Sequence, residues 1–437
     1  MAPAARRTIK KILAFFGLGF LILVLTSSYV ILKAYDYQPL TVRTNDPDHS
    51  YQKYTLFAPV VDDIGLELDT PNTIYLADMN GEVAHRWRVL GSVQLARLRS
   101  NGNLLYTTRD YSFQPRAGLR EIGPFGDLIW HFKCRADHDF AVLPNDNILV
   151  HHIEDKEASA VSSGKARCPI LTELTPQKDV VWQWRGEEHV DELTTLLGIT
   201  FPLSNPEGEH MFDGVFDWAH NNTCSVIQEN EAAPKDARFK PGNILFSYCN
   251  LNTIGIIDKE SGRIVWAWGP GVLDGQHNPR MMKNGHILLF DNGTKRGYSR
   301  VIEFNPLSNQ IVWEYSDRHS PNPEFHSRYL SGAQPLPNGN VFICQGTYTP
   351  KGDTASALYD SVRLRLFGRP TQRSRLFEVN RSHQIVWEMI VTQSAHSYHE
   401  VYQATRYSHA YVQPLFDRVK EGDNSETRPL RSLPYMR

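Results

Sequence analysis

The chain has 437 residues, of which 41% are hydrophobic and 22% are charged, as is typical of globular proteins. Its formal net charge of -2 and pI near 6.8 lack the basic excess of nucleic-acid-binding proteins, so we expect no nucleic-acid partner. The five cysteines have no metal-ligand spacing such as C-x-x-C, which argues against a zinc or iron–sulfur site, and their odd number allows at most two disulfides.

The first predicted element is a membrane anchor. Four Arg and Lys residues between positions 6 and 11 precede residues 12–32, which are 21 uncharged and mostly apolar residues, enough to span a bilayer as a transmembrane helix. The run is longer than the apolar region of a cleavable signal peptide, and no clear small-residue cleavage site follows it. We therefore favour an uncleaved, single-pass signal-anchor. Its basic flank, 1–11, would lie in the cytoplasm, and the chain after the linker 33–50 would lie on the periplasmic or luminal side.

Short phrases recur along the rest of the chain. A phrase centred on tryptophan occurs six times: GEVAHRW (81–87), GDLIWHF (126–132), KDVVWQW (178–184), GRIVWAW (262–268), NQIVWEY (309–315) and HQIVWEM (383–389). A phrase with an Asn-Gly-type turn between apolar runs occurs five times: RLRSNGNLLY (97–106), AVLPNDNILV (141–150), KPGNILFSYC (240–249), MMKNGHILLF (281–290) and PLPNGNVFIC (335–344). The turn phrases predict hairpins of strands A and B, and another strand, C, precedes most tryptophan strands, D. Four strands in about 40 to 50 residues are typical of one β-propeller blade.

Six tryptophan strands predict an all-β, six-bladed β-propeller over residues 51–412, followed by a C-terminal tail at 413–437. Only five A–B hairpins are visible, so we expect the remaining blade to combine residues 51–59 with residues 399–412 from the other end of the chain. Such pairing closes the ring and removes an exposed sheet edge. We interpret the tryptophans as residues that pack between blades, without a direct functional role.

Candidate functional residues lie where strand A begins. Strand A is innermost in a propeller, and antiparallel strands alternate in direction, so the starts of strand A, the B–C loops and the D–A loops open on one face. The polar residues predicted at these starts are Gln94, His138, His220, His277, Ser331 and, with a weaker alignment, His399. Arg296 follows strand B of the hairpin that His277 opens. Insertions at 185–217 and 348–374 fall on the same face, and long loops in compact repeats are usually functional.

These phrases, in this order, resemble the bacterial arylsulfotransferases. The likeness covers residues 53 to 405 and is carried by HDFAVLPNDNILV, QHNPRMMKNGHILLFDNG, SGAQPLPNGNVFICQG and RLFEVNRSHQIVWE. Members of that family are six-bladed propellers that transfer a sulfuryl group between phenols, without a nucleotide donor, through a sulfated histidine. The resemblance implies a small phenolic or sulfated substrate, and we expect neither a cofactor nor a bound metal.

The resemblance also implies roles for single residues. His220 and His277 match two family histidines at strand starts, and Arg296 matches the family arginine. The chemistry agrees, because a planar guanidinium can hold sulfonate oxygens and imidazole can serve as acid, base or nucleophile toward a phenol. We predict Arg296 as the clamp on the sulfonate oxygens and His220 and His277 as acid/base or oxygen-stabilising groups.

One family feature is missing at the predicted position. The family's nucleophilic histidine follows strand B of the blade after that of His277, where this chain has Thr347 and Tyr348. If a covalent intermediate forms, another residue must carry it, and His138 and His399 are weaker candidates.

Two classes of function therefore stay open. The first is a membrane-anchored aryl-sulfate transferase. The second is a non-catalytic, membrane-anchored propeller that binds an anionic or aromatic ligand or a protein partner. A quinone-dependent dehydrogenase propeller is disfavoured by the six blades and by the lack of a metal-ligand cluster in the sequence.

Overall fold

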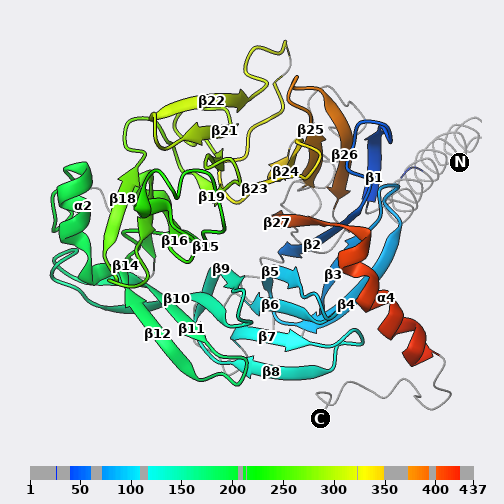
Figure 1. Ribbon diagram of the computed structural model, residues 1–437, viewed down its shortest axis with the longest axis horizontal. Coiled ribbons are helices and arrows are strands. Elements are labelled where there is room, and N and C mark those ends of the chain that lie inside the picture. The colour runs from blue at the N-terminus through cyan, green and yellow to red at the C-terminus, as the bar shows by residue number, and fades with distance from the viewer. Residues whose placement is uncertain are drawn as a thin grey trace, which may run out of the picture.

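The structure is a computed structural model that describes residue 26 and residues 40–60, 71–108, 117–204, 210–212, 214–321, 323–348, 373–392 and 400–423. Its strands form six sheets, antiparallel except for one β11–β14 bridge, arranged around a central axis, as Figure 1 shows. The predicted six-bladed β-propeller is thus confirmed.

Each blade has the predicted order of four strands from the axis outward. The first three blades are β27 (Glu400–Tyr407), β2 (Tyr54–Val60), β3 (Pro71–Ala77) and β4 (Val83–Leu90); β5 (Val93–Leu98), β6 (Leu104–Thr108), β7 (Gly118–Ile122) and β8 (Leu128–Phe132); and β9 (Ala136–Val142), β10 (Ile148–Glu157), β11 (Lys165–Leu174) and β12 (Val180–Arg185). The last three are β15 (Asn221–Val226), β16 (Ile244–Tyr248), β17 (Thr253–Ile257) and β18 (Ile264–Trp268); β19 (His277–Met281), β20 (Ile287–Asp291), β21 (Arg300–Asn305) and β22 (Gln310–Tyr315); and β23 (Gly332–Pro335), β24 (Val341–Tyr348), β25 (Arg373–Val379) and β26 (Ile385–Thr392).

Short strands and helices lie in the loops that connect the blade strands. The strands β13 (Met211–Phe212) and β14 (Val215–Phe216) and the helices η1 (Gly186–Glu188) and α2 (Val190–Leu197) lie in the insertion at 185–217. The helices η2 (Ala237–Phe239) and η3 (Cys249–Leu251) lie in the fourth blade. Of the insertion at 348–374, residues 349–372 lie outside the described residues.

The two ends of the chain close the ring in one blade. β27 pairs antiparallel with β2, with Tyr407 opposite Tyr54 and Val401 opposite Pro59. This pairing confirms the predicted composite blade of residues 51–59 and 399–412, although residue 399 itself lies outside the described residues.

Two segments outside the predicted blades form regular structure. Residues 40–45, placed in the linker by the sequence prediction, form β1 (Leu40–Asn45), a fifth strand that covers the outer edge of the sixth blade by pairing with β26. Residues 409–423, around the predicted boundary between propeller and tail, form α4 (His409–Asp423). Val412 and Leu415 on α4 are fully buried against the first and second blades, because their three-residue spacing places both on one face of the helix.

No helix within the described part of the chain is long and apolar enough to cross a membrane. The anchor predicted at residues 12–32 lies outside the described residues, except for Thr26.

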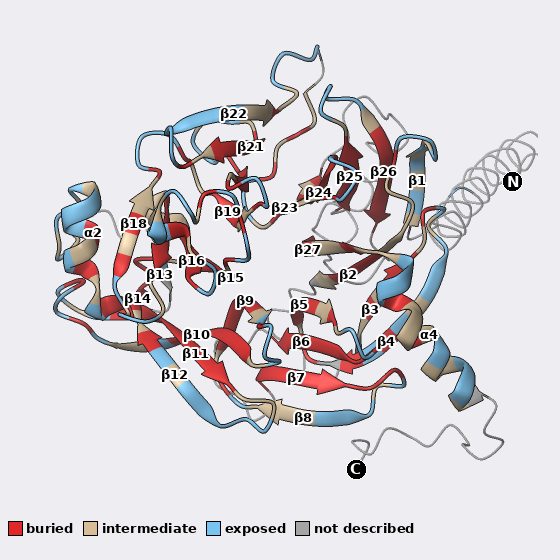
Figure 2. Cartoon of the chain, in the orientation of Figure 1, coloured by how far each residue is buried: buried red, intermediate tan, exposed pale blue. Residues whose placement is uncertain are grey.

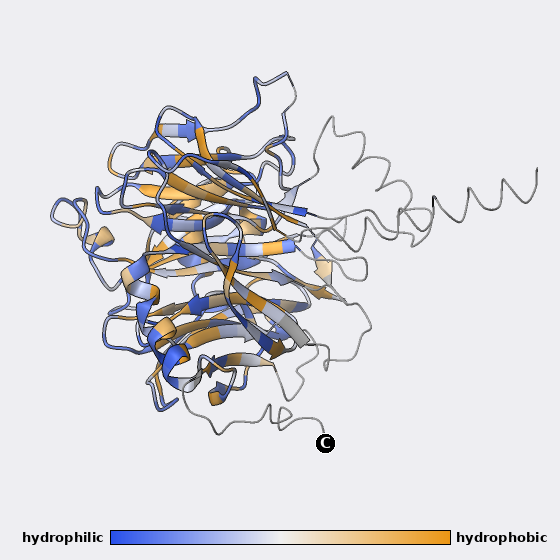
Figure 3. Cartoon of the chain, turned by 90° about the vertical axis from the view of Figure 1, so that its right-hand side faces the viewer, coloured by the Kyte–Doolittle hydropathy of each residue, from blue (hydrophilic) through white to orange (hydrophobic). Residues whose placement is uncertain are grey.

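The tryptophans of the outer strands join neighbouring blades. The indole Nε1 groups of three of them donate to backbone oxygens of the next blade: Trp184 to Gly262 at 2.7 Å, Trp313 to Arg381 at 3.3 Å and Trp387 to Met79 at 2.8 Å. Figure 2 shows buried residues in the inner part of the blades and exposed residues on outer strands such as β8, β12 and β22. In the side view of Figure 3, apolar residues lie along the strands inside the blades. The tryptophans therefore act as packing residues, as predicted.

We expect Trp387→Ala to lower the free energy of unfolding by about 3–5 kcal/mol, because it empties a fully buried site and removes a hydrogen bond between the sixth and first blades. Trp182→Ala is the matched control, since Trp182 is only half-buried, and should cost less than half as much. Urea denaturation followed by circular dichroism measures both values. Equal losses in the two variants would contradict a role for Trp387 in joining the blades.

Candidate functional site

A cavity of about 430 Å³ lies where the six inner strands begin. Its lining residues come from all six blades and from the loops beside them: Gln94, His138, His210, His220, Cys249, Asn250, Asn252, Asp274, Gly275, His277, Thr294, Lys295, Arg328, Tyr329, Leu330, Glu400 and Tyr402. The predicted convergence of Gln94, His138, His220 and His277 is therefore observed. Ser331 is buried just before β23, beside the lining residue Leu330.

The backbone is held in an unusual conformation at the strand starts. Left-handed backbone occurs at His138 with φ 58°, at His220 with φ 45°, at Asn278 with φ 55° and at Ser331 with φ 87°. Only a few per cent of non-glycine residues adopt positive φ, and each costs energy that the surrounding structure must offset. Such positions cluster at functional sites. Here His138 and His220 line the cavity, and Asn278 and Ser331 directly follow the lining residues His277 and Leu330.

Two histidines of the cavity are paired with buried carboxylates. His220 Nδ1 lies 2.6 Å from Asp217 Oδ2, and His138 Nδ1 lies 2.8 Å from Asp137 Oδ1. Burial alone would raise the pKa of each carboxyl, but the adjacent imidazole outweighs it and the pKa of Asp137 and of Asp217 is lowered. The two imidazole rings lie edge to face with 4.6 Å between their centres. A carboxylate at Nδ1 orients the ring and supports its cationic form, as a general acid or base requires.

His277 has a different environment from the other two. Its ring is 97% buried, and Nδ1 lies 2.9 Å from Asn292 Oδ1 and 3.0 Å from the Gly275 carbonyl. The amide of Asn292 donates through Nδ2 to the carbonyls of Ser327 and Leu330, so Oδ1 is the acceptor that faces His277. Both partners of Nδ1 are acceptors, and Nδ1 must therefore carry the proton.

The unprotonated nitrogen of His277, Nε2, is the one available to the cavity. Burial, with a smaller contribution from the nearby rings of His138 and His220, lowers the pKa of His277 to about 3. The imidazole is therefore neutral at physiological pH and holds a free lone pair, as a nucleophile needs.

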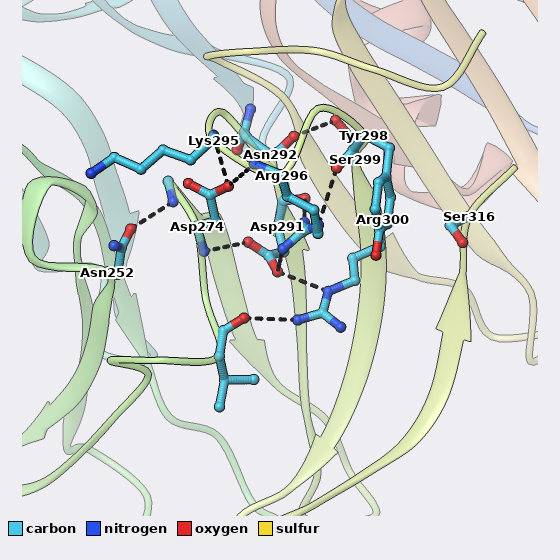
Figure 4. Close-up of polar contacts among 12 residues, drawn as sticks. Asn252, Asp274, Asp291, Asn292, Lys295, Arg296, Tyr298, Ser299, Arg300 and Ser316 are labelled. Carbon is cyan, nitrogen blue, oxygen red and sulfur yellow. Dashed lines mark hydrogen bonds and ion pairs between the residues drawn. The ribbon is translucent and has the colours of Figure 1, made fainter. Parts of the chain in front are cut away.

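The guanidinium of Arg296 does not line the cavity. Figure 4 shows it directed at Asp291, and the Nη1–Oδ2 distance is 3.0 Å. Nη2 donates to the Asp291 carbonyl, Nε donates to the Tyr298 carbonyl, and the guanidinium lies over the Tyr298 ring. Because Asp291 is fully buried, this ion pair is part of the packing of the fifth blade. The predicted position of Arg296 in the B–C loop is correct, but its side chain stabilises the blade through the ion pair with Asp291.

Two other cations line the cavity instead. Lys295 and Arg328 are both exposed lining residues, and neither makes an ion pair within the described part of the chain. Lys295 is the neighbour of Arg296, whereas Arg328 comes from the loop between β22 and β23. Their positive charges are available to an anionic ligand in the cavity.

The remaining predicted residues lie elsewhere. Thr347 Oγ1 is 2.7 Å from Ser327 Oγ, and Tyr348 is buried with its hydroxyl donating to Glu324 at 2.7 Å and accepting from Arg43 at 2.9 Å. Neither lines the cavity. His399 lies outside the described residues, and its neighbour Glu400 is the lining residue at the start of β27.

Several site residues were missed in the sequence prediction. Asp137 immediately precedes His138, and Asp217 precedes His220 by three residues. An Asp shortly before a His at the start of an inner strand could therefore have predicted both pairs. His151 carried no such signal, yet one of its ring nitrogens lies within 4.8 Å of ligand atoms of Asp137 and His138, a set that could hold a metal ion. All five cysteines are unpaired, and burial raises the pKa of the lining Cys249 to about 12, which keeps it a thiol.

Comparison with known proteins places the chain in a family. The sequence model described as arylsulfotransferase (ASST) matches residues 127–351, just over half of the 437-residue chain. The chain belongs to the arylsulfotransferase family. No curated protein matches this arylsulfotransferase-family chain.

Matching solved structures include a protein of unknown function from Bacteroides caccae that is 15% identical; the match covers 81% of this chain and 98% of that chain, with a TM-score of 0.48. Another is BamB from Moraxella catarrhalis, 10% identical, covering 79% of this chain and 99% of its own with a TM-score of 0.31. At such identities and scores, neither likeness says anything about function.

We expect the arylsulfotransferase-family protein to lose stability as the pH falls. Burial lowers the pKa of His277 to about 3 and that of His151 to about 4, so between about pH 6.5 and pH 4 the unfolded chain binds more protons than the folded one. The free energy of unfolding should fall by up to about 1.4 kcal/mol per pH unit for each imidazole. Urea denaturation at a series of pH values should show a shallower slope for His277→Gln than for wild type. The exposed His319→Gln is the control, and a slope unchanged in His277→Gln would refute the assignment.

Proposed function

We propose that the protein transfers a sulfuryl group from one phenol to another without a nucleotide donor, in the cavity at the starts of the inner strands. The observation that carries this proposal is the combination of a neutral, buried His277 with two imidazole–carboxylate pairs around one cavity. Its volume of about 430 Å³ lies within the range of small-molecule sites. Membership of the arylsulfotransferase family supports the same reaction class.

In the first half of the proposed reaction, Nε2 of His277 attacks the sulfur of an aryl sulfate. The N–S bond forms, the bond between sulfur and the aryl oxygen breaks, and the leaving phenolate takes a proton from the His220 imidazolium. In the second half, neutral His220 accepts the proton of the acceptor phenol, whose oxygen attacks the sulfur. The N–S bond breaks and His277 is returned neutral. Asp217 supports the charged form of His220 in both halves.

The positive ring that forms at His277 is supported by the same contacts that fix its tautomer. Nδ1–H continues to donate to Asn292 Oδ1 and the Gly275 carbonyl while Nε2 bears the sulfuryl group. Lys295 and Arg328 supply positive charge for the sulfonate oxygens, a role that the sequence prediction gave to Arg296. We therefore assign the covalent carrier to His277; this assignment is supported because Thr347 and Tyr348 do not line the cavity and the ring of His138 is paired with Asp137.

We also propose that the propeller is anchored with this cavity toward a membrane, on the extracytoplasmic side. β1 begins at Leu40, which pairs with Val391 near the end of β26, and that end opens on the cavity face. The predicted anchor ends at residue 32, and the seven residues 33–39 can span no more than about 25 Å. Substrates that partition into the membrane would then meet the cavity directly.

We expect His277→Asn to reduce kcat/KM for transfer from 4-nitrophenyl sulfate to phenol by at least about 10³-fold, because it removes the nucleophile. His220→Gln should cost about 10²–10⁴-fold, as expected for a general acid and base. Release of nitrophenol measures both rates. Mass spectrometry of wild type quenched with aryl sulfate alone should show one added SO3 on a peptide that contains His277. No turnover of any aryl sulfate by wild type, with the ligand still bound, would favour the non-catalytic binding propeller instead.

A matched pair of arginine variants tests the cations. Arg328→Gln should raise KM for the aryl sulfate about tenfold with little effect on melting temperature, because Arg328 is an exposed lining residue. Arg296→Gln should instead lower the melting temperature, because it leaves buried Asp291 with one ionic partner fewer. A raised KM in Arg296→Gln together with a lowered melting temperature in Arg328→Gln would instead support Arg296 as the sulfonate clamp.

Full-length protein expressed in its host should sediment with membranes and resist extraction by high salt, whereas a chain that begins at residue 40 should be soluble. Protease added outside intact cells or sealed vesicles reports the side on which the propeller lies. Full-length protein in the soluble fraction would exclude the anchor.

A further inference from the structure

A second cavity, of about 380 Å³, lies at the other end of the propeller axis. It gathers the last residues of the inner strands, as the first cavity gathers their first residues. Arg97 and Arg280 line it together with Asp139, Tyr407, Ser225 and Tyr411 of α4. The lining thus contains two guanidinium groups and one carboxylate.

Both carboxylate oxygens of Asp139 already accept hydrogen bonds from groups other than Arg280. Its Oδ1 accepts from Arg97 Nη2 at 2.7 Å and from the Phe140 amide at 2.9 Å. Its Oδ2 accepts from the Cys224 amide, in the next blade, at 3.0 Å. Arg97 is further fixed by a hydrogen bond from Nε to the Phe140 carbonyl at 3.0 Å. The Arg97–Asp139 pair is therefore a neutral, structural unit.

Arg280 is left without a counter-charge. The one hydrogen bond of its side chain to the described residues runs from Nε to Asn278 Oδ1 at 3.3 Å, and no carboxylate in that part of the chain forms an ion pair with it. Burial, and next the charge of Arg97, lower the pKa of Arg280 to about 10, so the group is still cationic at neutral pH. Arg280 lines the cavity, and neither of its Nη groups donates a hydrogen bond to the described residues.

A half-buried guanidinium without a partner is costly, and a bound anion offsets that cost. We propose that this second cavity is a binding site for a small oxyanion, a carboxylate or a sulfate group, held by Arg280. A planar guanidinium presents two parallel N–H donors that match two oxygens of either group. The rings of Tyr407 and Tyr411, stacked with centres 5.0 Å apart, form an apolar wall that suits an aromatic body on the anion.

This site is separate from the proposed catalytic cavity. The two cavities share no lining residue. Arg280 and His277 lie three residues apart on β19, which corresponds to about 10 Å along a strand. The charge of Arg280 is therefore too far from the sulfur position at His277 to act as its clamp.

Isothermal titration calorimetry of the full chain with sodium benzoate and with sodium sulfate tests the site. Wild type should bind one or both anions, and Arg280→Gln should weaken binding at least about tenfold, as expected for loss of a charge-assisted pair. Benzoate binding tighter than sulfate binding would identify the aromatic wall as part of the site, and the opposite order would identify inorganic sulfate as the better ligand. The exposed Arg263→Gln, outside both cavities, is the matched control and should bind the same anion with unchanged affinity.

A competition on wild type keeps the test independent of folding defects. Benzoate or sulfate affinity measured with the catalytic cavity saturated by phenol, which carries no oxyanion for Arg280 to hold, should stay within about twofold, because the two sites are separate. Arg280→Lys should keep the charge and part of the affinity. No heat from either anion with wild type, loss of binding in Arg328→Gln with retention in Arg280→Gln, or displacement by phenol would overturn the proposal.

Discussion

The convergence of six inner strands on one axis is the constraint on which the rest of this molecule depends. Each strand must begin on one face and end on the other, so a residue at a strand start meets the starts of the other five blades. Histidines more than fifty residues apart in the sequence thereby reach one cavity without any local motif. The same geometry makes a second cavity at the strand ends, with a different set of residues.

Two features of the strand starts affect the stability of the propeller. The strand starts hold left-handed backbone at non-glycine residues, and they bury imidazoles that stay neutral. The left-handed backbone opposes folding at every pH, whereas the buried imidazoles oppose it only below about pH 6.5. The indole contacts between blades and the pairing of β2 with β27 offset these costs. Stability is thus concentrated at the outer strands and the ring closure, whereas strain is concentrated near the axis.

The periodic parts of the fold could be predicted from sequence, and the positions of side chains could not. Asn-Gly turns and tryptophan strands repeat, so blade number, ring closure and the strand starts followed from their spacing. β1 was missed because one six-residue strand in a linker repeats nothing. Arg296 was placed in the right loop, but its guanidinium pairs with Asp291, five residues earlier. Whether Arg280 is neutralised depends on Asp139 in another blade, which spacing alone does not reveal.

The pairing of the last strand with the second has a consequence for biosynthesis. β27 is innermost in the first blade, yet it is the last of the described strands to be made, and it supplies Glu400 and Tyr402 to one cavity and Tyr407 to the other. A nascent or truncated chain therefore has an open ring with an unpaired inner edge on β2, and neither cavity is complete. Neither cavity can be complete until β27 has been made, and a premature stop before residue 400 would remove its contribution to both cavities while leaving the five sequential blades in the sequence.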